Sequence, residues 1–268
     1  MKLTYLSRLL TATLLATTAS ATLIFEDDFS SGTAADAGYY RFGTTGTTLA
    51  VDTGTLNYSY SGDAANRSGV IKQFTNTTLQ MGEVLTFSFT IDARDLRNDE
   101  NNSFRWSIGN IGTTVNADLT SAEPFSSGTR RNYVFAAATG TATTAINQHA
   151  SGFASPVNGG TTTAIPGLNA SNFDHNSSDP FVIAVSFTRT ATGLDIEKNF
   201  GGSLSSGSFA TANGADFDFN TLAFSFNNAG DYSAALDNIS VTVIPEPATI
   251  GLMGIALLSM LAFRRRKA

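Results

Sequence analysis

Apolar and polar residues alternate in several stretches of the chain between residues 22 and 243, and this period of two predicts β-strands. In LTFSFTID the odd positions from Leu85 to Ile91 are apolar, and threonine, serine and aspartate fill the positions between them. Such a strand places one face on a core and the other in solvent. The same pattern recurs at 103–109, 132–136, 181–189, 222–227 and 239–243.

Alternating strands are typical of antiparallel sheets, whereas buried parallel strands are apolar on both faces. Turns rich in Gly, Asn and Ser separate these strands, and no convincing amphipathic helix occurs between them. We therefore predict an all-β domain, a two-sheet antiparallel β-sandwich, over residues 22–243. Residues 139–179 keep no period, and they are predicted to form either a long functional or disordered loop or one or two edge strands.

The first 21 residues have the pattern of a secretory signal peptide. Lys2 and Arg8 form a basic start, an apolar stretch follows, and Ala19-Ser20-Ala21 resembles a cleavage site with small residues at Ala19 and Ala21. We expect export machinery and a signal peptidase to act here. Cleavage would leave Thr22 as the new N-terminus.

The chain ends in three distinct parts, within residues 244–268. Pro245, Glu246 and Pro247 form a motif that stays out of helix because each proline fixes its own backbone angle. The uncharged run 248–263 follows and predicts a short transmembrane helix. The basic cluster then ends the run and is expected to stay cytoplasmic, which leaves the domain outside; it consists of Arg264, Arg265, Arg266 and Lys267.

The amino-acid composition and the charge of the chain exclude several classes of function. There is no cysteine, so disulfides, thiolate metal sites and cysteine nucleophiles are excluded. Residues 22–243 hold 10 basic and 21 acidic residues, a net charge of −11. An acidic body argues against nucleic acid, because phosphates are neutralised by basic patches. It is compatible with divalent cations, neutral glycans and solubility.

The motif, the apolar run and the basic end together resemble the PEP-CTERM sorting domain of Gram-negative bacteria. The resemblance implies recognition by a membrane protease-transpeptidase called exosortase, a cut near Pro245–Pro247, and delivery to the cell surface or the extracellular polymer. The alternative is a permanent membrane anchor. Sorting tails of this type follow many unrelated domains, so the tail says nothing about the function of residues 22–243.

The order of strands in the middle is similar to concanavalin-like and laminin-G-like jelly rolls. IFEDDFSSG resembles their opening strand, VDTGTLNYSYSG their strand pair around Gly54, FVIAVSFTRTATGLDIEKNFGG their paired strands across a Thr-Gly turn, and YSAALDNISVTV their closing strand. The resemblance implies a jelly roll and admits both sugar binding and glycan hydrolysis.

The sequence offers a few candidates for catalysis. Asp195 and Glu197 share a strand face, as paired glycosidase carboxylates do, but Lys198 and Asn199 follow where a third carboxylate would stand. The alternative is a solvated strand face. His149 and the second histidine, His175, lie in the polar region without a nucleophile elbow or a metal-binding cluster. We therefore predict that the protein is not an enzyme.

Two aspartates are candidates for a structural Ca²⁺. Asp27 shares the parity of Phe25 and Phe29, and Asp237 shares the parity of the apolar closing strand, so both are predicted at the rim of the core. A carboxylate turned toward a core needs a partner, and Ca²⁺ binds such oxygens. The alternative is that Asp237 caps backbone N–H groups and Asp27 is exposed.

We thus expect a non-catalytic surface or extracellular-matrix protein, with extracellular polysaccharide as its candidate partner. Sugar binding favours exposed aromatic side chains, and the candidates are Tyr39, Tyr40, Tyr58 and Tyr60, whereas Trp106 is predicted in the core. The alternatives are a concanavalin-like polysaccharide-active enzyme and a permanently anchored adhesin.

Overall fold

The computed structural model describes residues 20–30, 32–43, 46–62, 68–95, 104–112, 114–119, 132–136, 147–149, 162–164, 168, 176–210, 216–226 and 230–245. Several predicted features lie outside these residues: Ala19 and most of the signal peptide, Glu246, Pro247, the apolar run 248–263 and the basic cluster 264–267. Within the described part, no helix has the length and apolar character needed to cross a membrane.

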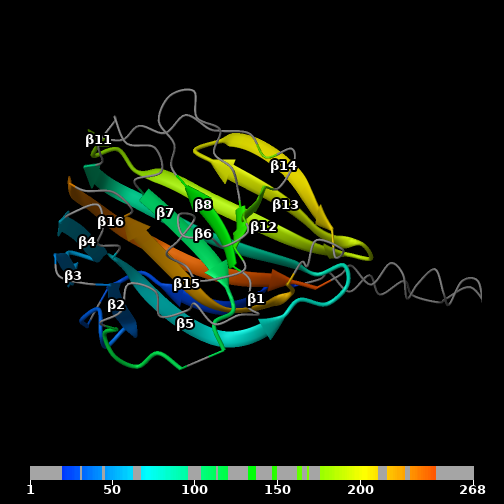
Figure 1. The fold of residues 1–268 in the computed structure, drawn as a ribbon, viewed down its shortest axis with the longest axis horizontal. Coiled ribbons are helices and arrows are strands. Elements are labelled where there is room, and N and C mark those ends of the chain that lie inside the picture. Colours follow the sequence, from blue (N-terminus) through cyan, green and yellow to red (C-terminus); the bar gives the residue numbers. More distant parts are fainter. Residues whose placement is uncertain are drawn as a thin grey trace, which may run out of the picture.

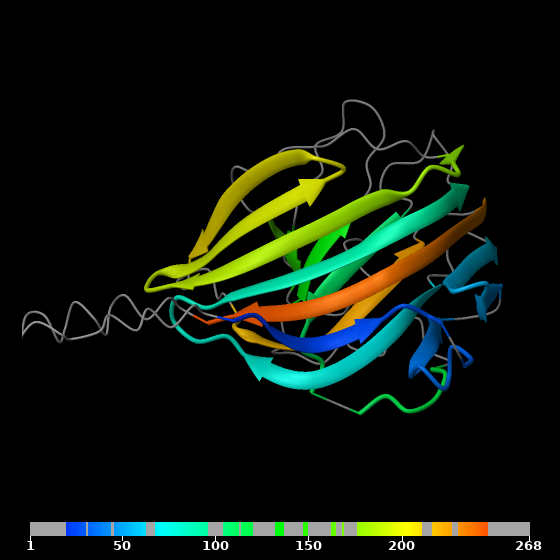
Figure 2. The same ribbon diagram turned by 180° about the vertical axis from the view of Figure 1, so that it is seen from behind.

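The described elements are all strands, and they form two antiparallel sheets, which confirms the predicted sandwich (Figures 1 and 2). In sheet A the order is β14 (Ser203–Ala210), β13 (Gly193–Phe200), β12 (Phe181–Thr190), β6 (Val84–Asp95), β16 (Gly230–Ile244), β4 (Thr55–Gly62) and β3 (Thr47–Asp52), with β1 (Thr22–Asp27) beside β16 and β11 (Asn176–Ser177) beside β6. In sheet B the order is β10 (Thr162–Ala164), β9 (Asn147–His149), β8 (Asn132–Ala136), β7 (Phe104–Gly109), β15 (Asp218–Phe226), β5 (Ser68–Thr78) and β2 (Tyr39–Gly43).

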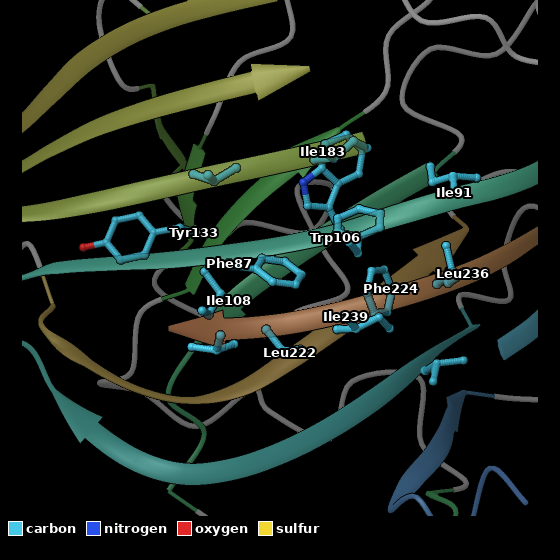
Figure 3. Close-up of a cluster of buried hydrophobic side chains, with 14 of the residues drawn as sticks. Phe87, Ile91, Trp106, Ile108, Tyr133, Ile183, Leu222, Phe224, Leu236 and Ile239 are labelled. Atoms are coloured by element: carbon cyan, nitrogen blue, oxygen red, sulfur yellow. The ribbon is translucent and has the colours of Figure 1, made fainter. Parts of the chain in front are cut away.

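The core lies between the two sheets and is made by the alternating apolar positions that the sequence predicted. From sheet A, β6 contributes Leu85, Phe87, Phe89 and Ile91, all at most 1% exposed. From sheet B come Trp106 and Phe224 (Figure 3). The rings of Trp106 and Phe89 meet edge to face, with their centroids 5.8 Å apart. The prediction of Trp106 as a core residue is therefore confirmed.

The last strand, β16, changes its inward parity in the middle. Leu236 and Ile239 are both fully buried, although they are three residues apart, because Asn238 has a positive φ of 49° and inserts an extra residue opposite β6. This is a β-bulge, which re-aims the side chains that follow it. Asp237 consequently lies on the outer face with Thr90, and its predicted place on the core face is wrong.

The polar region 139–179 contains short strands where the structure describes it. β9 and β10 extend the edge of sheet B, and β11 pairs with the end of β6 through Asn176–Asp95 and Ser177–Arg94. The sequence alternative of edge strands is thus confirmed for these pieces. The side chain of His149 and the whole of His175 lie outside the described residues.

Part of the outer face of sheet B is covered by the chain that follows β7. Ile111 and Val115 pack on Phe42, Ile71 and Ala223 in a second buried cluster. An ion pair between Arg41 and Asp118, with nitrogen and oxygen 2.5 Å apart, fastens the same segment to β2. The outer face of sheet A has no such apolar cluster among the described residues, so its polar side chains are open to a ligand.

Candidate functional site: a polar groove on sheet A

The outer face of sheet A is lined by small polar side chains. Where the central strands run side by side, their hydroxyls pair across strands: Thr86 with Ser186 and Ser88 with Ser240, each at 2.9 Å. These short side chains leave the backbone of the sheet close to the surface and add no large aromatic ring to it. The face therefore offers many hydroxyl donors and acceptors close to the sheet surface.

A groove with a volume of about 410 Å³ lies at one end of this face. Two rows of side chains, each running across four paired strands, supply most of its lining. The first row is Ala93, Ala235, Asn57 and Ala50, and the second is Asp95, Ser233, Ser59 and Thr48. Ser177 and Ser178 from the β11 region also line the groove.

The floor thus combines three alanines with hydroxyl and amide groups. The Thr48 and Ser59 hydroxyls lie 2.6 Å apart, so their orientations are coupled. The buried guanidinium of Arg94 donates to the backbone oxygen of Asp179 at 2.9 Å, which ties the chain after β11 to the sheet. Asp95 is the acidic residue of the lining, and the groove can offer a neutral polyol hydrogen bonds above small apolar patches.

Two carboxylates stand on the outer face next to the groove. Asp92 directly precedes Ala93, and Asp237 lies one β16 position beyond Leu236, opposite Thr90. Burial raises the pKa of the Asp92 carboxyl, and the nearby negative charge of Asp237 raises it further. Asp92 and Asp237 follow the buried residues Ile91 and Leu236, so both acids point outward, and the pairing of β6 with β16 brings them close together. The sequence pattern does not reveal this pair, because it joins strands far apart along the chain.

The two calcium candidates lie near each other but face differently. Asp27 is opposite Ile239 on the inner side of the sheet, whereas Asp237 is on the outer side. Asp237 accepts hydrogen bonds from the backbone N–H of Asn238 at 2.6 Å and from its side-chain amide at 2.7 Å. The sequence alternative, in which Asp237 caps backbone N–H groups, is thus confirmed for the Asn238 N–H.

Asp27 is surrounded by other charges and by aromatic rings. Its carboxylate accepts the N–H of Phe29 at 3.0 Å, and burial raises its pKa against the opposing effects of that bond and of Lys72. The Lys72 ammonium lies over the rings of Phe25 and Tyr39, 4.9 and 5.4 Å from their centroids, and donates to the oxygen of Ala37. In the described part of the chain, no three His, Asp or Glu residues gather as a metal site.

The other sequence candidates lie away from the groove. Asp195 and Glu197 are exposed on one face of β13, as predicted, and Ser208 donates to Asp195 at 2.6 Å. The strand β13 is separated from β16 by β12 and β6. Lys198, the residue after Glu197, points inward and is fully buried.

The tyrosines proposed as stacking platforms are mostly buried. Tyr39, Tyr58 and Tyr60 are each 1% exposed, and Tyr40 is partly buried beside the cluster on sheet B. The prediction of exposed rings is therefore wrong for the first three. Tyr58 and Tyr60 alternate with Asn57 and Ser59, so the polar residues, not the rings, face the groove.

The sorting motif begins where the sheet ends. β16 pairs with β1 through Val243 and Thr22, and with β6 through Ile244 and Val84. Pro245 follows Ile244 directly and is partly buried. Almost no linker separates the last strand from the motif.

Comparison with known proteins agrees with both parts of this architecture. A family model described as the PEP-CTERM protein-sorting motif matches residues 243–267. No curated protein matches the chain. Among solved structures, the chain resembles lectin UEA-II complexed with galactose, at 9% identity and a TM-score of 0.50, over 84% of this chain and 99% of that chain.

Two other solved structures have similar folds. A carbohydrate esterase of the Shiga toxin-encoding bacteriophage phi24B is 12% identical, with a TM-score of 0.51, over 84% of this chain and 100% of that one. An endo-1,3-β-glucanase from Streptomyces sioyaensis is 13% identical, with a TM-score of 0.49, over 84% and 96%. At such identities the likeness concerns the fold, which is a lectin-like jelly roll.

The C-terminal sorting motif supports a conclusion about where the protein is sent. Its motif indicates an exported protein of a Gram-negative bacterium that is held transiently in the membrane and processed by an exosortase. The chain is thus a jelly-roll sandwich that carries a PEP-CTERM protein-sorting motif at its C-terminus.

Proposed function

We propose that the sandwich is a non-catalytic glycan-binding domain that exosortase sorting delivers to the cell surface or the extracellular matrix. The observation that carries the proposal is the groove on sheet A, with its rows of hydroxyl, amide and alanine side chains. Hydroxyl and amide groups can both donate to and accept from sugar hydroxyls. The alanines leave room for a sugar ring to approach the sheet.

The charge of the domain favours a neutral glycan. Residues 22–243 carry a net charge of −11, and the groove itself contains Asp95, while the guanidinium of Arg94 is buried. An anionic polysaccharide would be repelled by this field. Among the described groove residues the one tyrosine, Tyr58, is buried, which favours hydrogen bonding rather than ring stacking as the main contact.

A glycan array with the purified sandwich, residues 22–245, tests the proposal. Ala235→Tyr fills the floor of the groove, and Ala184→Tyr makes the same change on the outer face of β12, outside the groove. We expect neutral glycans to bind the wild type and the Ala184 variant, and binding to fall at least about tenfold in the Ala235 variant, since the ring takes the place of the sugar. Equal binding by both variants would refute the groove as the site.

A second candidate function, glycan hydrolysis, is favoured by one observation. Asp92 and Asp237 are two carboxylates close together on the outer face, and burial and the Asp237 charge raise the pKa of Asp92 in the direction that the acid of a glycosidase pair needs. A hydrolysis screen run beside the array separates the two functions. Turnover that disappears in both Asp92→Asn and Asp237→Asn would establish the enzyme and displace the binding proposal.

The proposal includes no metal. The sequence predicted a structural Ca²⁺ at Asp27 and Asp237, but the two side chains leave the sheet on different sides, so they are poorly placed to share one ion.

A further inference from the structure

The start of the first strand and the end of the last strand lie at the same end of the sandwich. Thr22 pairs with Val243, and Ile244 pairs with Val84 at the start of β6. The β5–β6 turn lies there as well, since the N–H of Gly82 donates to the oxygen of Arg189 at 2.8 Å, near the end of β12. Figure 2 shows these strand ends together at the left of the molecule. We call this region the tail-proximal end.

The length of chain after β16 places this end close to the membrane segment. Four residue steps separate Ile244 from Ala248, the first residue of the apolar run, and they span at most about 14 Å of extended chain. With the transmembrane run predicted from the sequence in the bilayer, the domain cannot stand further away than this. The tail-proximal end therefore lies within reach of the lipid headgroups.

The exposed side chains at this end suit such a neighbour. Among the described residues five large hydrophobic side chains are exposed, and three of them lie here: Leu23 at 54%, Met81 at 49% and Ile244 at 39%. Leu23 is opposite Thr242 on the outer face, two positions from Ile244, and Met81 is at the tip of the β5–β6 turn. Exposed apolar groups that gather at one end mark an interaction surface.

The charged side chains beside this surface are engaged within the protein. Glu83 accepts the N–H of Gln80 at 2.7 Å. Arg189 donates to the oxygen of Leu79 and lies over the ring of Phe217, 4.2 Å from its centroid. Neither Glu83 nor Arg189 therefore covers the three apolar side chains or attracts an anionic partner to them.

We propose that, while the sorting tail is in place, the tail-proximal end rests in the interfacial layer of the bilayer, with Leu23, Met81 and Ile244 in contact with lipid. The groove is then turned away from the membrane, because β6 runs from Val84 at this end to Asp95 in the groove lining. The proposal rests on the sorting tail and is independent of whether the groove binds glycan.

Spin labelling tests this orientation, and the natural absence of cysteine makes single labels straightforward. Met81→Cys and Val182→Cys are matched sites: both replace exposed aliphatic side chains, but Val182 pairs with Thr90, six β6 positions or about 20 Å from Val84. The full-length chain, with its tail intact, is placed in vesicles of phosphatidylethanolamine and phosphatidylglycerol. The accessibility of each nitroxide to oxygen, enriched in lipid, and to a water-soluble nickel chelate is then measured.

We expect the oxygen-to-nickel accessibility ratio to be severalfold higher at position 81 than at position 182. Leu23→Cys is a second site and should behave like position 81. Water-like ratios at both 81 and 182 would overturn the proposal. A label at position 81 that is shielded from both oxygen and nickel would also overturn it, because such shielding indicates contact with a second protein copy or another protein partner. A chain that fails to float with the vesicles would overturn it as well.

Discussion

At the scale of single residues, Lys198 has an environment unlike the one its sequence context suggests. It follows two exposed acids on β13, yet it points inward, is fully buried and has its ammonium 4.6 Å from the centre of the Phe200 ring. Burial lowers its pKa from the usual 10.5 to about 8. The folded protein thus holds this proton less tightly than the unfolded chain does.

The stability of the fold should therefore rise with pH between about 8 and 10. In this range the unfolded chain binds a proton that folded Lys198 has released, so the free energy of unfolding increases, by about 2 kcal/mol between pH 7 and pH 9.5. Lys198→Met should remove most of this rise and be more stable than the wild type at pH 7; a smaller part should remain, because burial also lowers the pKa of Lys72. Urea unfolding at the two pH values measures both effects, with Glu197→Gln as control; a rise of undiminished size in the methionine variant would contradict the assignment.

Calcium dependence is a second question at this scale. Asp237 faces outward with both oxygens bonded to Asn238, and Asp27 lies within the influence of the Lys72 charge. We therefore expect the same melting temperature in calcium and in EGTA, because an ion bound only by the folded state would raise it. A rise in calcium that Asp27→Asn abolishes would establish the ion site predicted from the sequence.

At the scale of elements, the bulge in β16 decides which side chains enter the core. Asn238, with a φ of 49°, lets Leu236 and Ile239 both point inward. Asparagine and glycine adopt this conformation with little strain, whereas a β-branched residue does not. The bulge also delivers Asp237 to the outer face beside Asp92.

We predict that Asn238→Gly changes the free energy of unfolding little, while Asn238→Val lowers it by about 1–3 kcal/mol through backbone strain. Thr242→Val is the matched control, since it introduces valine on the outer face of the same strand where the backbone is extended and should be nearly neutral. Denaturant unfolding of the three variants compares them. A valine at 238 that costs no more than one at 242 would show that the bulge is not under conformational constraint.

The same elements show how much of the fold and the site the sequence could predict. Alternation identified β6, β12 and β15 with their inward faces, because period two follows directly from strand geometry. It missed the bulge, since nothing in DNIS marks an extra residue, and so it placed Asp237 wrongly. It could not find the groove, because Ala50, Asn57, Ala93 and Ala235 become neighbours only through pairing of strands far apart in sequence.

At the scale of the whole molecule, the groove and the tail occupy opposite ends of sheet A. β6 spans twelve residues from Val84 to Asp95, so the groove lies about 35 Å along the strand from the tail-proximal end. In the proposed orientation, a binding site at this distance points away from the bilayer even before the tail is cut. The arrangement thus makes sorting and the proposed ligand binding compatible in one chain.

The position of the exosortase cut is constrained by the same architecture. The end of β16 is paired on both sides, with β1 through Val243 and with β6 through Ile244, so a cut before Val243 would remove pairings that close sheet A. We predict that the mature C-terminus lies at or after Ile244. Mass spectrometry of the exported protein measures it directly.

The melting temperatures of two truncated chains test separately whether the sandwich needs the end of β16. A chain that ends at Pro245 should melt at the temperature of the full-length chain, because it keeps every described strand pair. A chain that ends at Ser240 should be much less stable, since it loses the buried side chains of Val241 and Val243, each worth about 1.5–3 kcal/mol. An exported protein that still carried Arg264–Lys267 would contradict processing, whereas a mature end before Val243 would show that the protease acts on a β16 that has separated from its neighbours.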